Sequence, residues 1–150
     1  MITLLRTDSD NKDFAELVKY LDAYLAKIDG DEHAFYAQLN KTDKIKHVVI
    51  AYENEKPVGC GAIRETSSGI MEVKRMYTFP EDRGKGVATK VLGELEKWAT
   101  EMDYQKCVLE TGKRQPEAIA LYKKSGYKSI PNYGKYAEVE NSVCFEKEMK

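Results

Sequence analysis

The stretch EVKRMYTFPEDRGKGVAT, residues 72–89, predicts a strand, a short turn, a basic loop with two glycines and the start of a helix. Gly84 and Gly86 lack the Cβ atoms that would hold a ligand away from the backbone. Arg83 and Lys85 place two cations beside them. The helix that follows directs its first unpaired N–H groups and the positive end of its dipole to the same place. This arrangement is typical of a site for a phosphate-bearing ligand.

Two common phosphate-binding patterns do not fit this loop. A Walker loop has a glycine five residues before its Gly-Lys pair and a Ser or Thr after it, whereas this chain has Phe79 and Gly86 there. A dinucleotide fingerprint follows its strand directly and has Gly or Ala at its third position. Here Thr89 occupies that position, and residues 80–83 separate the strand from the glycines. A helix N-terminus with two incidental glycines is the plain alternative.

Residues 110–127, ETGKRQPEAIALYKKSGY, form a second motif. Together the two motifs resemble the GNAT superfamily of acyl-CoA-dependent N-acetyltransferases. The family pattern is Arg-Gly-x-Gly-x-Ala after a strand, then Asn-x-x-Ala-x-x-x-Tyr, then Gly and an aromatic residue. Residues 83–88 match its first part, and the second part is matched by Ala118, Tyr122, Gly126 and Tyr127. Gln115 stands where Asn is usual.

The resemblance implies an α/β (α+β) fold: a mixed, mostly antiparallel central sheet flanked by helices, in one domain over residues 1–150. In that fold the fourth and fifth strands splay apart and coenzyme A enters the gap. It implies acetyl-CoA as cosubstrate, no metal, and a pantetheine arm that pairs with the backbone of Met76 and Thr78. The residues that it assigns to cofactor binding are Met76, Tyr77, Thr78, Arg83, Gly84, Lys85, Gly86, Val87, Ala88, Thr89 and Gln115.

Two side chains are candidates for catalysis. A hydroxyl near the departing thiolate could protonate it, and Tyr122 matches the family position for this role. The alternative is a core tyrosine on an amphipathic helix. An alkyl amine is almost fully protonated at pH 7, so the enzyme must accept a proton from it. Glu72, on the strand that would hold the thioester, is the candidate base, and a solvated strand carboxylate paired with Lys74 or Arg75 is the alternative.

The acceptor is not fixed by the sequence. A small-molecule amine is expected, attacking the thioester directly. A protein (lysine or N-terminal) acetyltransferase and an inactive, CoA-binding regulatory domain are the alternatives. Acidic residues near the expected acceptor end would suit a cationic amine or a solvated face: Asp29, Asp31, Glu32, Glu138 and Glu140. Tyr133 and Tyr136 would line an acceptor pocket or cap the sheet end.

Charge and composition limit the classes of partner that are expected. Acids and bases are mixed along a chain of net charge −1, without a basic arm for nucleic acid or a polybasic membrane patch. No apolar run reaches the ~20 residues that span a bilayer, and residues 1–8 do not resemble a signal peptide, so a cytoplasmic location is expected. Whether the chain forms a homodimer stays open. Cys60, Cys107 and Cys144 each lie in an apolar strand pattern and are expected to be small buried thiols.

Periodicity and turn residues predict the elements along the chain. Strands are expected over residues 2–6, 46–53, 58–64, 70–79, 105–110, 127–130 and 142–147. Helices are expected after the cap candidates Asp8, Ser9 and Asp10, over residues 32–39, after Gly86, and over residues 116–124, where Pro116 suits a first turn and Gly126 a stop.

Overall fold

The computed structural model describes residues 1–29 and 44–149. The helix expected over residues 32–39 lies outside the described residues, as do Asp31, Glu32 and the side chain of Asp29.

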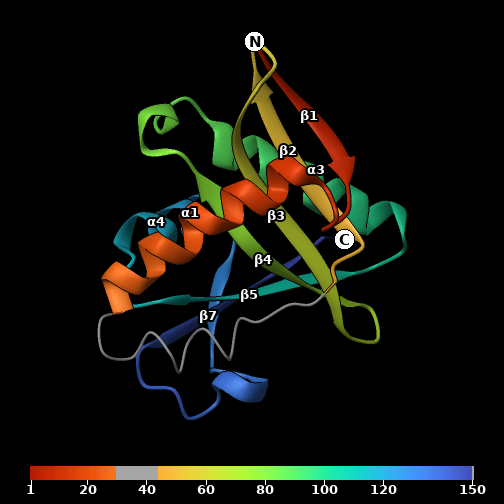
Figure 1. Ribbon diagram of the computed structural model, residues 1–150. Coiled ribbons are helices and arrows are strands. Elements are labelled where there is room, and N and C mark those ends of the chain that lie inside the picture. The colour runs from red at the N-terminus through yellow and green to blue at the C-terminus, as the bar shows by residue number, and fades with distance from the viewer. Residues whose placement is uncertain (30–43, 150) are drawn as a thin grey trace.

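A seven-stranded sheet with the order β1-β2-β3-β4-β5-β7-β6 forms the centre of the described chain (Figure 1). Its strands are β1 (Ile2–Thr7), β2 (His47–Glu53), β3 (Lys56–Ser67), β4 (Ile70–Thr78), β5 (Lys106–Gly112), β6 (Lys128–Ile130) and β7 (Ser142–Glu148). All neighbouring strands are antiparallel except β4 and β5, which are parallel. The mixed, mostly antiparallel sheet that we expected is confirmed.

Strands β4 and β5 separate halfway along their length. Their pairing runs from Ile70 opposite Lys106 to Val73 opposite Leu109. Beyond that point β4 continues to Thr78 along β3, and β5 continues to Gly112 along β7. The expected splay of the fourth and fifth strands is therefore confirmed, and one edge of the second half of β4 faces the gap.

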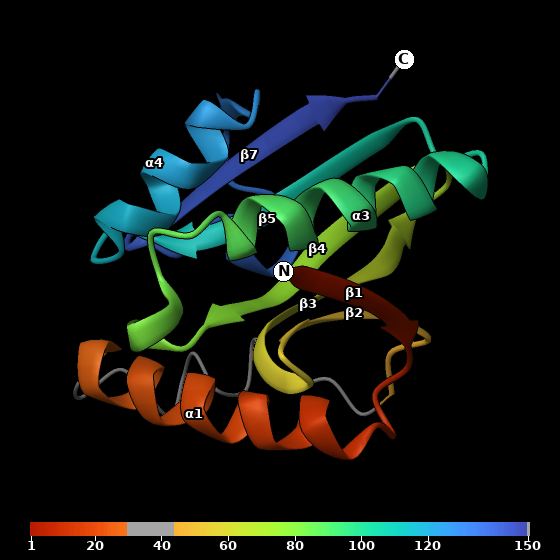
Figure 2. The same cartoon turned by 90° about the horizontal axis from the view of Figure 1, so that it is seen from above.

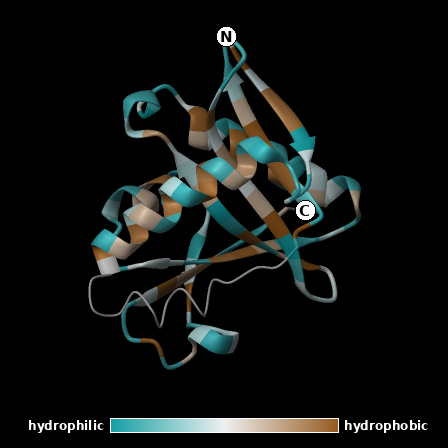
Figure 3. Cartoon of the chain, viewed as in Figure 1, coloured by the Kyte–Doolittle hydropathy of each residue, from teal (hydrophilic) through white to brown (hydrophobic). Residues whose placement is uncertain are grey.

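Helix α1 (Lys12–Asp29) covers one face of the sheet, while α3 (Val87–Glu101) and α4 (Pro116–Lys124) cover the other (Figure 2). Two apolar clusters fill the space between these layers. One lies beneath α1 and contains Phe14, Leu17 and Leu21 with residues of β2 and β3. The other lies beneath α3 and α4 and contains Leu95 and Tyr122. Helix α1 carries hydrophobic and hydrophilic residues side by side, as an amphipathic helix does (Figure 3).

The start of α1 differs from the prediction. Its cap is Asn11, whose Oδ1 accepts hydrogen bonds from the backbone N–H groups of Asp13 and Phe14 at 2.8 and 3.2 Å. The cap candidates Asp8, Ser9 and Asp10 are wrong, because the Ser9 hydroxyl accepts the Ile45 N–H and Asp8 Oδ1 accepts the Asp10 N–H. These side chains fix the bend between β1 and α1 instead of the helix itself.

The turn between β2 and β3 is tighter than expected. Asn54 and Glu55 both have positive φ, 52° and 66°, which is the geometry of a two-residue type I′ hairpin turn. Strand β3 therefore begins at Lys56, opposite Glu53, and Pro57 lies within the strand.

The three cysteines are free and buried, which confirms the expected buried thiols. Burial raises the pKa of the Cys60 and Cys107 thiols to about 12, so both stay protonated at neutral pH. None of the helices within residues 1–29 and 44–149 combines the length and apolar character needed to cross a membrane.

Candidate active site

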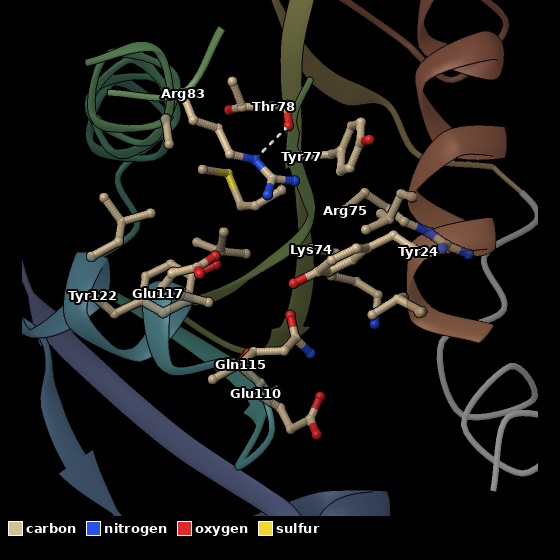
Figure 4. Close-up of a pocket in the computed structure, with 18 of the residues that line it drawn as sticks. Tyr24, Lys74, Arg75, Tyr77, Thr78, Arg83, Glu110, Gln115, Glu117 and Tyr122 are labelled. Atoms are coloured by element: carbon tan, nitrogen blue, oxygen red, sulfur yellow. Dashed lines mark hydrogen bonds between the residues drawn. The ribbon is translucent and has the colours of Figure 1, made fainter. Parts of the chain in front are cut away.

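A cavity of about 610 Å³ lies where β4 and β5 separate. Side chains from α1, β4, β5 and α4 surround it (Figure 4). Most of the predicted site residues line it, namely Glu72, Met76, Tyr77, Thr78, Arg83, Gly84, Ala88, Gln115 and Tyr122. Lys85, Gly86, Val87 and Thr89 do not appear among its lining residues.

The backbone of the glycine loop is accessible to a ligand at both glycines. Gly84 and Gly86 both have φ near +83°, a conformation that a side chain would strain, and a Cβ atom at either position would meet nothing within 4 Å. Gly86 is the N-cap of α3, and the first helical hydrogen bond runs from the Lys90 N–H to the Gly86 carbonyl at 3.0 Å. The amides of residues 87–89 precede that bond and point out of the helix end. This end of α3 can therefore accept an anion.

The two cations of the loop have different surroundings. The Lys85 ammonium forms ion pairs with Glu53 at 3.0 Å and Asp82 at 3.1 Å, outside the cavity. Arg83 bends back into the cavity, where its Nε donates to the Thr78 carbonyl at 3.0 Å (Figure 4). Its guanidinium also lies over the rings of Tyr24 and Tyr77, 5.5 and 5.8 Å from their centroids. Arg83 thus links helix α1 to the edge of β4.

A β-bulge reshapes β4 next to the cavity. Arg75 has a φ of +58°, and the register with β3 shifts between Cys60, opposite Tyr77, and Ala62, opposite Lys74. A bulge of this kind turns the following side chains and increases the local twist. Arg75 itself forms an ion pair with Asp22 of α1 at 2.9 Å. The sequence offered no signal for this bulge.

Helix α4 holds Tyr122 on its buried face, and the side chain reaches the cavity from the side opposite α1 (Figure 4). Burial raises the pKa of the Tyr122 hydroxyl above its usual range, and the Glu110 carboxylate adds to the rise. The hydroxyl is therefore neutral at physiological pH and carries a proton that it can donate. Gln115 is the N-cap residue of α4 without a side-chain cap bond, and it also lines the cavity.

Glu72 is a buried carboxylate with two donors. Tyr133 donates its hydroxyl to Glu72 Oε2 at 2.6 Å, and the Lys74 ammonium lies 3.4 Å from Glu72 Oε1. Glu72 and Lys74 are both only 8% exposed, so the solvated strand carboxylate considered from the sequence is wrong, although the pairing with Lys74 is present. Burial, and then the Glu72 charge, raises the pKa of Tyr133, which therefore keeps its proton for this bond.

Several residues that the sequence did not mark as site residues also line the cavity: Leu21, Tyr24, Leu25, Lys74, Glu110, Thr111 and Glu117. Glu110 accepts a hydrogen bond from the Ser142 hydroxyl at 2.6 Å. The strand spacing could have identified Lys74, because residues two apart on a strand point to the same face. Of the expected acidic residues, Glu138 and Glu140 are exposed and do not line the cavity. Tyr136 lines it, and its neighbour Tyr133 supports Glu72.

Comparisons with known proteins agree with this architecture. The sequence profile of the acetyltransferase (GNAT) family matches residues 14–127. An IAA acetyltransferase of Azospirillum brasilense is 31% identical over 148 residues, which are 97% of each chain. A Klebsiella pneumoniae protein described as a candidate acyl-CoA N-acyltransferase shares 30% identity and superposes with a TM-score of 0.84, over 100% of this chain and 99% of that one.

A more distant structure shows the fold alone. The GNAT family acetyltransferase of Elizabethkingia anophelis, solved with acetyl-CoA bound, is 17% identical and has a TM-score of 0.68 over 99% of this chain and 98% of its own. The profile match and the full-length similarity to the Azospirillum protein show the family directly. The chain belongs to the GNAT family of acetyltransferases and is an acyltransferase.

Proposed function

We propose that this chain transfers the acetyl group of acetyl-CoA to the primary amine of a small molecule by direct attack, without a covalent enzyme intermediate. The observation that carries the proposal is the single cavity that Gly84 and Arg83 of the glycine loop share with Tyr122 and Glu72. One end of this cavity suits a phosphate-bearing carrier, and the other presents a proton donor and a carboxylate.

The residues present fit acetyl-CoA. Its pyrophosphate would lie on the loop of Arg83 to Thr89, where the amides at the start of α3 and the two open glycines allow close approach. Its pantetheine arm would pair with the free edge of β4 at Met76 and Thr78, beyond the last pairing with β5. The Thr78 carbonyl now accepts a hydrogen bond from Arg83. Arg83 would therefore release this carbonyl and turn toward the phosphates when the cosubstrate binds.

The proposed reaction removes two protons from the substrate nitrogen. The substrate ammonium loses one proton before the amine nitrogen attacks the acetyl carbon. A C–N bond then forms and the C–S bond breaks. The leaving thiolate takes a proton from Tyr122, and the second proton of the attacking nitrogen restores the tyrosine hydroxyl, directly or through water. Overall, one proton stays on the thiol of CoA and one passes to solvent. We assign the first transfer to Glu72, directly or through a water at Oε1, whose contact with Lys74 is long.

The cavity favours a small acceptor. Leu21, Tyr24 and Leu25 of α1 line it opposite α4, so a helix covers the side from which the acceptor would approach. A volume of about 610 Å³ falls within the range that is usual for small-molecule sites. Catalysis in such a site rests on orientation of the two substrates and on management of the protons.

A screen of small primary amines with acetyl-CoA tests the proposal. Free thiol is measured continuously, and mass spectrometry identifies the acetylated product. We expect thiol release that depends on a subset of amines and a product acetylated on nitrogen. Acetylation confined to lysines or N-termini of added proteins would replace the small-molecule assignment. Acetyl-CoA binding with no turnover on any acceptor would indicate a CoA-binding domain instead of an enzyme.

A further inference from the structure

Lys74 is an unusual residue for the wall of a cavity. Its side chain is 6% exposed, yet it lines the cavity. Its ammonium has three donors, and the contact to Glu72 Oε1 at 3.4 Å lies at the long end of the hydrogen-bond range. A buried ammonium is stable only where oxygen acceptors surround it. The geometry therefore leaves donors available to an oxygen ligand inside the cavity.

The charges near Lys74 disfavour a plain amine as acceptor. Such an amine arrives as a cation, because its pKa lies well above 7. It would approach Glu72 while being repelled by the Lys74 ammonium, which already pairs with that carboxylate. Lys135 is a second cation near Lys74, since its pKa is lowered by burial first and by Lys74 second, while Glu72 and Glu110 act in the opposite sense. An acceptor that brings its own negative charge would relieve this repulsion.

The spacing of the ion pair indicates where that negative charge lies. The charged ends of Lys74 and Glu72 are 3.4 Å apart. An α-amino acid carries its ammonium and carboxylate on one carbon atom, at a comparable separation. Placed against the pair, its carboxylate meets Lys74 and its ammonium meets Glu72, so that four charges alternate in sign. A longer ω-amino acid separates the two groups too far to satisfy both residues at once.

We propose that the acceptor is an α-amino acid, bound through its carboxylate by Lys74 and presenting its amine beside Glu72. This inference rests on the proposed function and specifies its substrate. The product would be the N-acetyl amino acid. Leu21, Tyr24 and Leu25 offer apolar surface on the same side of the cavity, which suits an apolar amino-acid side chain (Figure 4 shows Tyr24).

Matched pairs of acceptors test this inference. Leucine is compared with 3-methylbutylamine, and phenylalanine with phenethylamine, since each amine lacks only the carboxylate. We expect the wild-type protein to have a kcat/KM at least about tenfold higher for the amino acid. Lys74→Met keeps the apolar stem and removes the charge. It should lower kcat/KM for leucine by about 10–100-fold, the usual effect of one charged hydrogen bond. It should change the value for 3-methylbutylamine by a smaller factor, so that the preference for leucine falls.

The control variant is Lys147→Met. Lys147 pairs with Glu96 at 2.9 Å, a carboxylate that also accepts a tyrosine hydroxyl, but none of these residues lines the cavity. This variant should leave the preference for leucine over 3-methylbutylamine intact. Lys74→Arg, which restores the charge, should recover part of the preference. If Lys74→Met does not fold, Lys74→Arg takes its place in the comparison of the two acceptors.

The outcomes separate this inference from the proposed function. A wild-type protein that prefers 3-methylbutylamine, or a preference that Lys74→Met leaves unchanged, would overturn the amino-acid assignment and leave the acetyltransferase proposal in place. A loss of equal size for both acceptors in Lys74→Met would make Lys74 a purely structural partner of Glu72. Acetyl-CoA binding without acetylation of either acceptor class, or of any other small amine, would overturn the proposed function and this inference with it.

Discussion

Tyr133 donates its hydroxyl to Glu72 over 2.6 Å, although 61 positions separate the two residues in the chain. Lys74 completes a tyrosine–glutamate–lysine set whose glutamate and lysine line the cavity. A second set of the same chemistry lies elsewhere, where Glu96 accepts the Tyr127 hydroxyl and the Lys147 ammonium, both at 2.9 Å. None of its members lines the cavity. The second set therefore serves as a control for the roles assigned to the first set, because the same residue types interact there outside the cavity.

Tyr133→Phe removes the donor to a buried carboxylate. We expect the free energy of unfolding to fall by about 1–3 kcal/mol at pH 7, because a Glu72 oxygen loses its partner. Folding raises the pKa of Tyr133, so this contribution is complete below pH ~10, where the unfolded tyrosine is neutral, and is lost as the pH rises above it. Urea unfolding at several pH values measures both effects.

The matched control for this change is Tyr104→Phe. Tyr104 donates to Glu65 at 2.8 Å in the same way, but at an exposed site. We expect little change in stability there, since water replaces the lost donor. Equal stabilities of the Tyr133→Phe variant and the wild-type protein would show that the short bond to Glu72 contributes nothing net.

Gly86→Val tests the phosphate loop. A β-branched side chain at φ +83° strains the N-cap of α3 and fills the space above the amides that follow. We expect calorimetry to show a large loss of acetyl-CoA affinity. Gly69→Val is the control, because Gly69 has a φ of +77° in the turn before β4, whereas the glycine loop follows the other end of that strand. It should cost stability but not affinity, and unchanged affinity in a folded Gly86→Val protein would remove the loop from the site.

Tyr122→Phe tests the proton donor. If the hydroxyl protonates the departing thiolate, kcat should fall by ~10²-fold or more while acetyl-CoA affinity stays nearly intact. Tyr127→Phe removes a neighbouring hydroxyl that bonds Glu96 outside the cavity, and it should leave kcat unchanged. The raised pKa of Tyr122 also predicts that wild-type activity does not decline near pH 10, where an exposed tyrosine would ionise. Full kcat in Tyr122→Phe, with chemistry rate-limiting, would return Tyr122 to the role of a core residue.

The sequence predicted the elements and the glycine loop because these depend on local signals. Gly84 and Gly86 are recognisable beside their cations, and Tyr122 was identified from the resemblance to the family pattern. The link between Tyr133 and Glu72 was not predictable, because the pairing of β5 with β7 determines where the loop after β6 lies. The bulge at Arg75 also brings distant segments together, because the sulfur of the next residue, Met76, occupies the space beside Gly61 of β3. Local patterns carry no information about such contacts between distant segments.

Glu72→Gln tests the base, with Glu96→Gln as its control. The amide keeps the shape of the side chain but accepts a proton far less readily. If Glu72 is the base, the rate at neutral pH should fall by ~10²–10⁴, the usual span for general base catalysis. Raising the pH toward the pKa of the amine should recover much of that loss, because solvent then removes the proton. Glu96→Gln changes a carboxylate with the same two kinds of donor and should leave the pH–rate profile as in the wild-type protein.

The shape of the profile decides between the roles of Glu72. A loss that is uniform across pH would mean that the carboxylate orients the ammonium of the acceptor without taking its proton. In that case Lys74→Met and Glu72→Gln should both raise KM for an amino acid, because each removes one side of the same ion pair. A wild-type profile in Glu72→Gln would instead assign the proton to another group in the cavity. Glu110 is then the next residue to change, because it lines the cavity and lies close enough to raise the pKa of Tyr122.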